Sequence, residues 1–253
     1  MPTALITGPT AGLGLEFARA LAGRRYDLVL VSRDAGRLGQ VADELTGRFG
    51  VDAEVLPADL ADRAQLHMVE QRLQRPKAPV DLLVNNAGFG LREPFPTGPI
   101  EDEQRMLDVL VGAVLRLSHA ALPPMLERGA GSIVNVSSVA GFFPSGTYAA
   151  AKAWVTSFSL ALDDSYRDRG CRVMALCPGF VHTEFHSRMD RRTDSIPEWM
   201  WLNAADVVAE ALAAMDAGSA LCIPSRRYRA IVTMARLAPR RVSAAVATRR
   251  PRP

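Results

Sequence analysis

Short apolar segments rich in valine, isoleucine and leucine recur along the whole chain. Runs this continuous are typical of strands that are buried on both faces of a sheet. Between them lie segments in which apolar residues follow the helical spacing. We predict strands over residues 3–7, 26–32, 52–58, 80–84, 131–137, 171–177 and 220–224, and helices over residues 13–24, 35–48, 62–75, 103–128, 148–168 and 204–217.

This alternation of strands and helices predicts an α/β fold with a doubly wound, seven-stranded parallel sheet and helices on both of its faces. Right-handed crossover connections would place the carboxyl ends of the strands along one edge of the sheet. Ligands of such folds bind at that edge, so it is where we expect a functional site.

The composition bears on the number of domains and on the location of the protein. The 253 residues, 48% of them hydrophobic, are enough for one domain with a full core. Three cysteines form neither a CxxC pair nor an even set, which is typical of buried thiols in a reducing compartment. The N-terminal segment has no secretory pattern, and no apolar run approaches the roughly 20 residues of a membrane span. We therefore expect a cytoplasmic location.

Charge is distributed unevenly. Residues 226–253 carry nine arginines and no acidic residue, whereas residues 1–225 carry 21 basic and 27 acidic residues. A short helix in this C-terminal segment would group six apolar residues on one side, namely Tyr228, Ile231, Val232, Met234, Ala235 and Ala238. Two interpretations stay open: a docked helix with a solvated tail, or contact with an anionic membrane at the cytoplasmic face. Nucleic acid is not expected as a partner, because aromatic interleaving and a recognition motif are missing.

A glycine-rich turn joins the first predicted strand to the first helix. The stretch ITGPTAGLG places Gly8, Gly12 and Gly14 in a G-x-x-x-G-x-G spacing, with Thr10 and Leu13 inside the same turn. Glycines here allow a tight turn and let backbone N–H groups approach a pyrophosphate at the helix N-terminus. A turn of this kind without a ligand is the alternative interpretation.

Five further motifs follow in order, each at the end of a predicted strand or the start of a helix. They are ADL (58–60), NNAG (85–88), IVNVSS (133–138), YAAAK (148–152) and PGFVHT (178–183). Together with the glycine-rich turn, they make the chain resemble the short-chain dehydrogenase/reductase family, whose turn reads T-G-x-x-x-G-x-G. The resemblance implies a Rossmann-type single domain over residues 1–225, with the basic helix and tail of residues 226–253 attached to it.

The same resemblance assigns further cofactor contacts. Asp59, with Leu60 beside it, would meet the adenine amino group, and Thr183 would reach the nicotinamide carboxamide or the phosphates. The remaining contacts would come from the NNAG and PGFVHT segments, through Asn86, Ala87, Gly88, Pro178, Gly179 and Val181.

The end of the second predicted strand bears on the choice of cofactor. NAD enzymes usually place an acidic residue there, where it accepts hydrogen bonds from the ribose 2′-hydroxyl. This chain has Ser32 followed by Arg33. A hydroxyl and a guanidinium suit a 2′-phosphate, because arginine binds phosphate oxygens through charge-assisted pairs. We predict NADP(H), with Arg33 facing solvent as the alternative. Arg37 is a candidate for a second contact, but we expect it on the outer face of the next helix.

The resemblance also assigns the catalytic residues. Tyr148 would be the general acid/base, Ser138 would hold the substrate oxygen, and Lys152 would contact the nicotinamide ribose. A free tyrosine has a pKa of about 10, and a cation one helical turn away lowers it toward neutrality. This is a physical reason for a lysine four residues after the tyrosine.

Two positions depart from the family pattern. Only ten positions separate Ser138 from Tyr148, fewer than in many members, so position matching is needed to prefer Ser138 over Ser137. Leu110 stands where the family often has an asparagine that completes a proton-relaying tetrad. A water held by a backbone carbonyl could still bridge to Lys152.

By the same resemblance, the segment over about residues 180–203 would be the family's substrate lid. Six apolar residues in it indicate a bulky hydrophobic substrate: Phe180, Phe185, Met189, Trp199, Met200 and Trp201. Packing of these residues on the body or on a dimer partner is the alternative. The pair His182 and His186 has a spacing that metal sites use, but without a third ligand we expect no metal. Long helices over 103–128 and 148–168 resemble those of the family's dimer interface, so a homodimer or homotetramer is expected.

These features predict an NADPH-dependent carbonyl reductase, most similar to bacterial 3-oxoacyl and keto-lipid reductases. A dehydrogenase of a steroid or polyketide-type alcohol is the enzymatic alternative. A non-catalytic NADP-binding regulatory or scaffold protein is the alternative from another class, and Leu110 is its main support.

Overall fold

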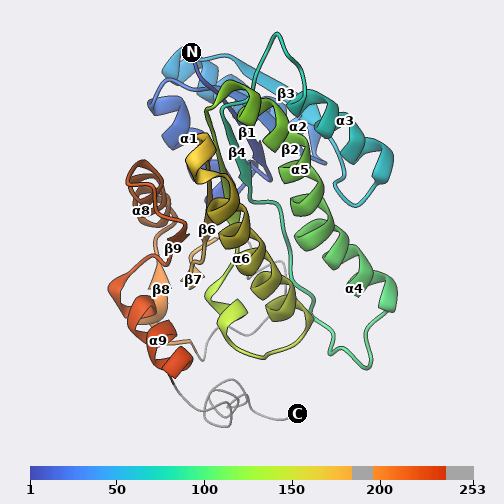
Figure 1. The fold of residues 1–253 in the computed structure, drawn as a ribbon. Helices are drawn as coiled ribbons and strands as arrows, with labels where there is room; N and C mark the ends of the chain where they lie inside the picture. The colour runs from blue at the N-terminus through green and yellow to red at the C-terminus, as the bar shows by residue number, and fades with distance from the viewer. Residues whose placement is uncertain (184–195, 238–253) are drawn as a thin grey trace.

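A central parallel sheet organises the computed structural model, which describes residues 1–183 and 196–237. It has seven parallel strands, as the alternating pattern predicts, and their order is β3-β2-β1-β4-β5-β6-β9 (Figure 1). The strands are β1 (Thr3–Thr7), β2 (Asp27–Ser32), β3 (Ala53–Pro57), β4 (Leu82–Asn85), β5 (Gly131–Val136), β6 (Cys171–Leu176) and β9 (Leu221–Cys222). The order reverses between β1 and β4, so a ligand crevice is expected where these two strands end.

Helices cover both faces of the sheet because successive strand residues point to opposite sides. On one face, Ile6 packs with α1 (Gly12–Gly23), α2 (Ala35–Phe49) and α8 (Ala204–Asp216). On the other face, Leu5 packs with α3 (Arg63–Leu73), α5 (Val114–Arg128) and α6 (Thr147–Tyr166). The adjacent residues Leu5 and Ile6 thus belong to different halves of the core, one on each face of the sheet.

The helix predicted over residues 103–128 is longer and less regular than expected. It begins as α4 (Ile100–Leu107), continues as a π-helix, η1 (Asp108–Ala113), and then becomes α5. By length and composition alone, the run Ile100–Arg128 could cross a membrane, but 56% of its most apolar window is buried in the protein. Its apolar side forms part of the core on the α3 and α6 face of the sheet.

A small two-stranded ribbon was not predicted. It pairs β7 (Phe180–Val181) with β8 (Trp201–Leu202), and the 3-10 turn η4 (Glu198–Met200) precedes β8. The ribbon lies beside the carboxyl end of β6 (Figure 1).

The C-terminal helix α9 (Arg226–Leu237) is docked on the body, as the first of the two interpretations expects for the helix itself. Tyr228 and Val232 are buried, whereas Met234, which was expected on the same side, is 64% exposed. The apolar side of the helix is therefore narrower than the sequence suggests. Ala238 and the rest of the tail lie outside the described residues.

Candidate active site

The glycine-rich turn forms a closely packed bend after β1. A Cβ atom on Gly14 would lie 2.1 Å from the Gly8 carbonyl oxygen, and Gly8 itself has a φ of +67°. No side chain in the described part of the chain caps the start of α1, so its first N–H groups point into the bend without a side-chain acceptor. This is the geometry in which a helix N-terminus accepts a pyrophosphate.

The NNAG segment is fixed to this turn by hydrogen bonds. Thr7 Oγ1 accepts from the backbone N–H groups of Asn86 and Ala87, both at 2.9 Å. The Asn86 side chain donates to the carbonyl oxygens of Thr7 at 2.9 Å and Gly8 at 3.1 Å. Asn86 therefore holds the two walls of the crevice together, a role that the motif alone does not reveal.

Ser32 and Arg33 lie at the carboxyl end of β2, where the 2′ position of the ribose is expected. The Ser32 hydroxyl oxygen is buried and has no hydrogen-bond partner among the described residues. A buried polar atom without a partner is costly, and a ligand oxygen would satisfy it. Arg33 is exposed. Arg37, on the first turn of α2, has its Nε 3.9 Å from Asp34 and is half exposed, as expected for the outer face.

Asp59 is held by residues from two sides of the crevice. Its carboxylate accepts from the Ala61 N–H at 3.0 Å and pairs with Arg105 of α4. Burial acts to raise the pKa of Asp59, but the Ala61 N–H and the Arg105 guanidinium outweigh it, and the pKa lies below its usual range. Leu60 is buried next to it. No motif of the sequence indicates Arg105, because its partner lies 46 positions away.

Tyr148 and Lys152 lie on the first turns of α6, whose start faces the ends of β4 and β5. The Lys152 ammonium is 5.8 Å from the centre of the Tyr148 ring and donates to the Val136 carbonyl oxygen at 2.7 Å. Lys152 is buried, and desolvation lowers its pKa to about 8. A buried ammonium beside a phenol favours the phenolate.

The two neighbouring serines have different surroundings. The Ser137 hydroxyl is buried and donates to the Lys152 carbonyl oxygen at 2.7 Å, at the same distance from Thr156 Oγ1. The Ser138 hydroxyl is only partly buried and accepts from the Ala140 N–H at 3.1 Å, at the start of the 3-10 turn η2 (Val139–Phe142). Ser137 thus anchors α6 to β5, and Ser138 is the better candidate for a substrate contact.

Leu110 lies on η1, next to Tyr148 and Lys152. It is fully buried, in one apolar cluster with Met106 and Ala151, against which Tyr148 packs. A Cβ atom on Gly88 would come within 2.7 Å of Leu110 and 3.9 Å of the Lys152 nitrogen. An aliphatic side chain thus occupies this place, and it can neither donate nor accept a proton.

The PGFVHT segment closes the other side of the crevice. The Pro178 carbonyl oxygen accepts from the Val139 N–H at 3.0 Å, and Val181 is buried in β7. The Thr183 side chain is 3.0 Å from the position that a Cβ atom on Gly12 would take. The structure therefore brings the last predicted cofactor motif against the first one. Thr10 and Leu13 are partly buried in the same turn.

His182 is held within the predicted lid segment. Its Nε2 is 3.0 Å from Glu198, and its ring stacks on Trp201 at 4.7 Å. Across residues 1–183 and 196–237, no group of three potential metal ligands is found. Phe185, His186 and Met189 lie outside the described residues.

The chain is similar in sequence to known short-chain dehydrogenases and reductases. The sequence model for short chain dehydrogenases matches residues 2–194. A very-long-chain 3-oxoacyl-CoA reductase of Anas platyrhynchos is 35% identical over 189 residues, which cover 72% of this chain but only 60% of that protein. Sulfoacetaldehyde reductase 2 of Chromohalobacter salexigens is 38% identical over 186 residues, which cover 72% of this chain and 73% of that protein.

Among solved structures, a short-chain dehydrogenase from Sphingobium yanoikuyae in complex with NADPH superposes with a TM-score of 0.86 at 32% identity, covering 100% of this chain and 98% of the other. A ketone-specific alcohol dehydrogenase from Comamonas testosteroni, described as acting on bulky-bulky ketones, superposes with a TM-score of 0.81 at 30% identity, covering 100% and 97%.

Proposed function

Because the chain belongs to the short-chain dehydrogenase/reductase family of oxidoreductases, we propose that it is an NADPH-dependent reductase of bulky hydrophobic ketones, of the 3-oxoacyl or keto-lipid type. The observation that carries the proposal is the buried Lys152 one turn from Tyr148, at the same sheet edge as the glycine-rich turn. The bound nicotinamide would supply the hydride. Residues of this chain would carry out all other steps.

Tyr148 is the proton donor in this proposal. As the carbonyl carbon receives the hydride, negative charge develops on the substrate oxygen, and the Tyr148 hydroxyl protonates it. Ser138 positions that oxygen by hydrogen bonding. The charge of Lys152 would favour the phenolate form of Tyr148, and its ammonium would also hold the ribose hydroxyls. With Leu110 at the family's asparagine position, reprotonation of Tyr148 has to use water and backbone carbonyls instead of an amide side chain.

The expected 2′-phosphate contact supports NADPH as the preferred cofactor. Ser32 offers a buried hydroxyl that has no hydrogen-bond partner within residues 1–183 and 196–237, Arg33 follows it, and neither is acidic. The solved relative from Sphingobium yanoikuyae contains NADPH. A carboxylate at this strand end would instead select the ribose 2′-hydroxyl of NADH.

Replacing Arg33 by aspartate is expected to weaken NADPH binding by about 10- to 100-fold, the range of a lost charge-assisted contact. NADH binding should change less than about threefold, because NADH has no 2′-phosphate to repel. Isothermal titration with both cofactors measures the two effects. Arg37→Asp on the outer face of α2 is the matched control. Equal losses for NADPH and NADH would overturn the assignment.

The apolar residues beside the site favour a hydrophobic substrate. Phe180 lies 5.7 Å from Trp201, ring centre to ring centre, on the β7–β8 ribbon, and Trp199 is 56% exposed close to it. Relatives at 35% and 30% identity act on 3-oxoacyl-CoA and on bulky ketones. A dehydrogenase of a steroid or polyketide-type alcohol would catalyse the same type of reaction in the opposite direction. It remains the alternative function.

The experiment that tests the function is NADPH oxidation against a matched set of carbonyl substrates. We expect turnover of 3-oxoacyl thioesters to rise with chain length and turnover of a bulky aryl ketone to exceed that of sulfoacetaldehyde. A preference for sulfoacetaldehyde would contradict the hydrophobic assignment. Zero turnover across the set, with NADPH binding confirmed by titration, would favour the non-catalytic NADP-binding protein.

Two partner assignments also remain predictions. Leu115 is 44% exposed on α5, and Trp154 stacks on Phe158 at 4.6 Å on α6, which fits the expected homodimer or homotetramer. Sedimentation velocity tests the oligomeric state, and a monomer would contradict the prediction.

Contact of the arginine-rich C-terminal segment with an anionic membrane is tested by co-sedimentation with phosphatidylserine vesicles. An intact protein that stays in solution would contradict this contact.

A further inference from the structure

The hydroxyl of Tyr228 joins two segments beside the active site. Tyr228 lies on α9 and is 3% exposed. Its oxygen accepts a hydrogen bond from the Phe180 N–H at 3.1 Å and donates one to the Met200 carbonyl oxygen at 2.7 Å. Phe180 begins β7 and Met200 directly precedes β8. One side chain of the C-terminal helix thus holds β7 at its first residue and β8 at the residue just before it.

The tyrosine ring also occupies the space beside Gly179. A Cβ atom at this position would lie 2.0 Å from the ring carbon that carries the hydroxyl. Position 179 therefore has to be glycine as long as Tyr228 is in place. Gly179 belongs to the PGFVHT segment, so the ring packs against the backbone that we expect to contact the nicotinamide.

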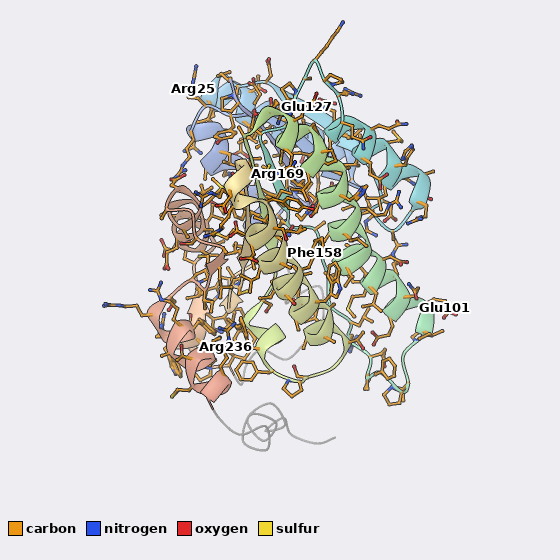
Figure 2. All side chains as sticks on the ribbon, in the orientation of Figure 1. Arg25, Glu101, Glu127, Phe158, Arg169 and Arg236 are labelled. Atoms are coloured by element: carbon orange, nitrogen blue, oxygen red, sulfur yellow. The ribbon has the colours of Figure 1, made fainter. Side chains whose placement is uncertain are left out.

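Two more contacts hold α9 in this place. The Arg236 guanidinium lies 4.8 Å from the centre of the Phe142 ring, at the end of η2. Figure 2 shows Arg236 on α9, at the end of the molecule that carries η2. Arg227 donates to the Trp199 carbonyl oxygen in η4. Since η2 follows Ser138, α9 contacts the segments that leave both β5 and β6.

We propose that Tyr228 is a positioning residue for the nicotinamide end of the cofactor, acting through the backbone of residues 178–183. The proposal rests on the NADPH-dependent activity argued above. Apolar packing of α9 would need only the ring, and a phenylalanine would provide it. The hydroxyl has a further role, because it forms hydrogen bonds with a backbone N–H of β7 and with the backbone carbonyl oxygen just before β8.

The C-terminal helix α9 is therefore part of the structure that positions the cofactor. The Tyr228 hydroxyl does not touch the reacting atoms. It keeps Val181 and Thr183 at the crevice by holding the residue just before them, Phe180. A shift of the nicotinamide by even a fraction of an ångström lowers the rate of hydride transfer, because the reacting atoms have to be close and aligned.

The test compares the whole cofactor with a fragment that lacks the nicotinamide. In Tyr228→Phe we expect NADPH binding to weaken by about five- to thirtyfold, the range of one or two ordinary hydrogen bonds, and kcat to fall as well. Binding of 2′,5′-ADP should change less than about twofold, because it uses only the Ser32 and Arg33 end. Tyr26→Phe, which makes the same chemical change before β2 at the opposite edge of the sheet, should leave all three values unchanged.

A second pair of variants tests the contact with Gly179. Gly179→Ala should weaken NADPH binding at least as much as Tyr228→Phe, because the new methyl group displaces the ring. In a Tyr228→Ala background the same substitution should add little further loss, since contacting residues are not additive. Fully additive losses would show that Gly179 acts independently of Tyr228.

Three results would overturn the proposal. The first is a Tyr228→Phe variant with unchanged NADPH binding and kcat, whatever its melting temperature, since that describes a purely structural tyrosine. The second is an equal loss of 2′,5′-ADP and NADPH binding. The third is full additivity with Gly179. If the wild-type protein binds NADPH but reduces no carbonyl compound, the proposed function fails, while the binding comparison still decides the role of Tyr228.

Discussion

Tyr148→Phe is expected to lower kcat for carbonyl reduction by about 10²- to 10⁴-fold, the usual contribution of a positioned general acid. The ring would keep its packing against the cluster of Met106, Leu110 and Ala151, so only the proton donor is removed. NADPH binding should change less than about threefold. Steady-state kinetics and a cofactor titration on the same preparation measure both effects.

Tyr166→Phe is the matched control, because this tyrosine ends the same helix and its ring lies beside Arg169, away from the site. It should leave kcat and cofactor binding unchanged. A Tyr148→Phe variant with wild-type turnover would remove Tyr148 from the mechanism, and a variant that no longer binds NADPH would make its role one of binding.

Lys152→Met is expected to abolish turnover and at the same time to stabilise the cofactor-free protein. Burial lowers the pKa of Lys152 to about 8, which corresponds to roughly 3 kcal/mol against the charged form. Methionine removes this penalty but leaves the Val136 carbonyl without its donor, a loss of about 1–2 kcal/mol. The net gain of about 1–2 kcal/mol should raise the melting temperature by roughly 2–8 °C at pH 7.

The pH dependence of this gain has a defined sign. The pKa of Lys152 is about 8 in the folded protein, below the value of about 10.4 in an unfolded chain. The penalty for burying the charge is therefore fully present below pH 8, and it disappears as the pH rises to about 10.4. The stability advantage of Lys152→Met should shrink over the same range, as thermal unfolding at several pH values would show.

Lys77 provides the control, because it is the other of the two lysines in the chain and is exposed between α3 and β4. Lys77→Met should change neither the melting temperature nor turnover. A lower melting temperature for Lys152→Met at pH 7 would show that the ammonium stabilises the ligand-free fold, contrary to this account.

The framework of the fold follows from local patterns. Buried strands such as β1 and β6 appear as continuous apolar runs, and glycines such as Gly14 mark a turn in which no side chain fits. Both signals act over a few residues, so they can be read from the sequence. The first and last motifs lie close together in the structure, because the Thr183 side chain is 3.0 Å from the position that a Cβ atom on Gly12 would take.

The remaining features depend on contacts between distant segments. Arg105 pairs with Asp59 across 46 positions, and Tyr228 bonds to Phe180 across 48. Neither pair has a spacing that periodicity can detect. The π-helix η1 is a small change in helical hydrogen bonding, and the apolar composition of residues 103–128 gives no sign of it. The different surroundings of Ser137 and Ser138 likewise depend on where α6 packs.

The placement of the two ends of the described chain has a practical consequence for preparing the enzyme. Met1 precedes β1 at the edge of the sheet opposite the crevice, and α9 lies beside the ribbon at the other end of the molecule (Figure 1). A purification tag or a surface linker attached before Met1 is therefore remote from the cofactor and substrate. A tag or linker attached directly after Leu237 would lie next to the residues that position the cofactor. Kinetic experiments should therefore use a protein that is fused at its N-terminus.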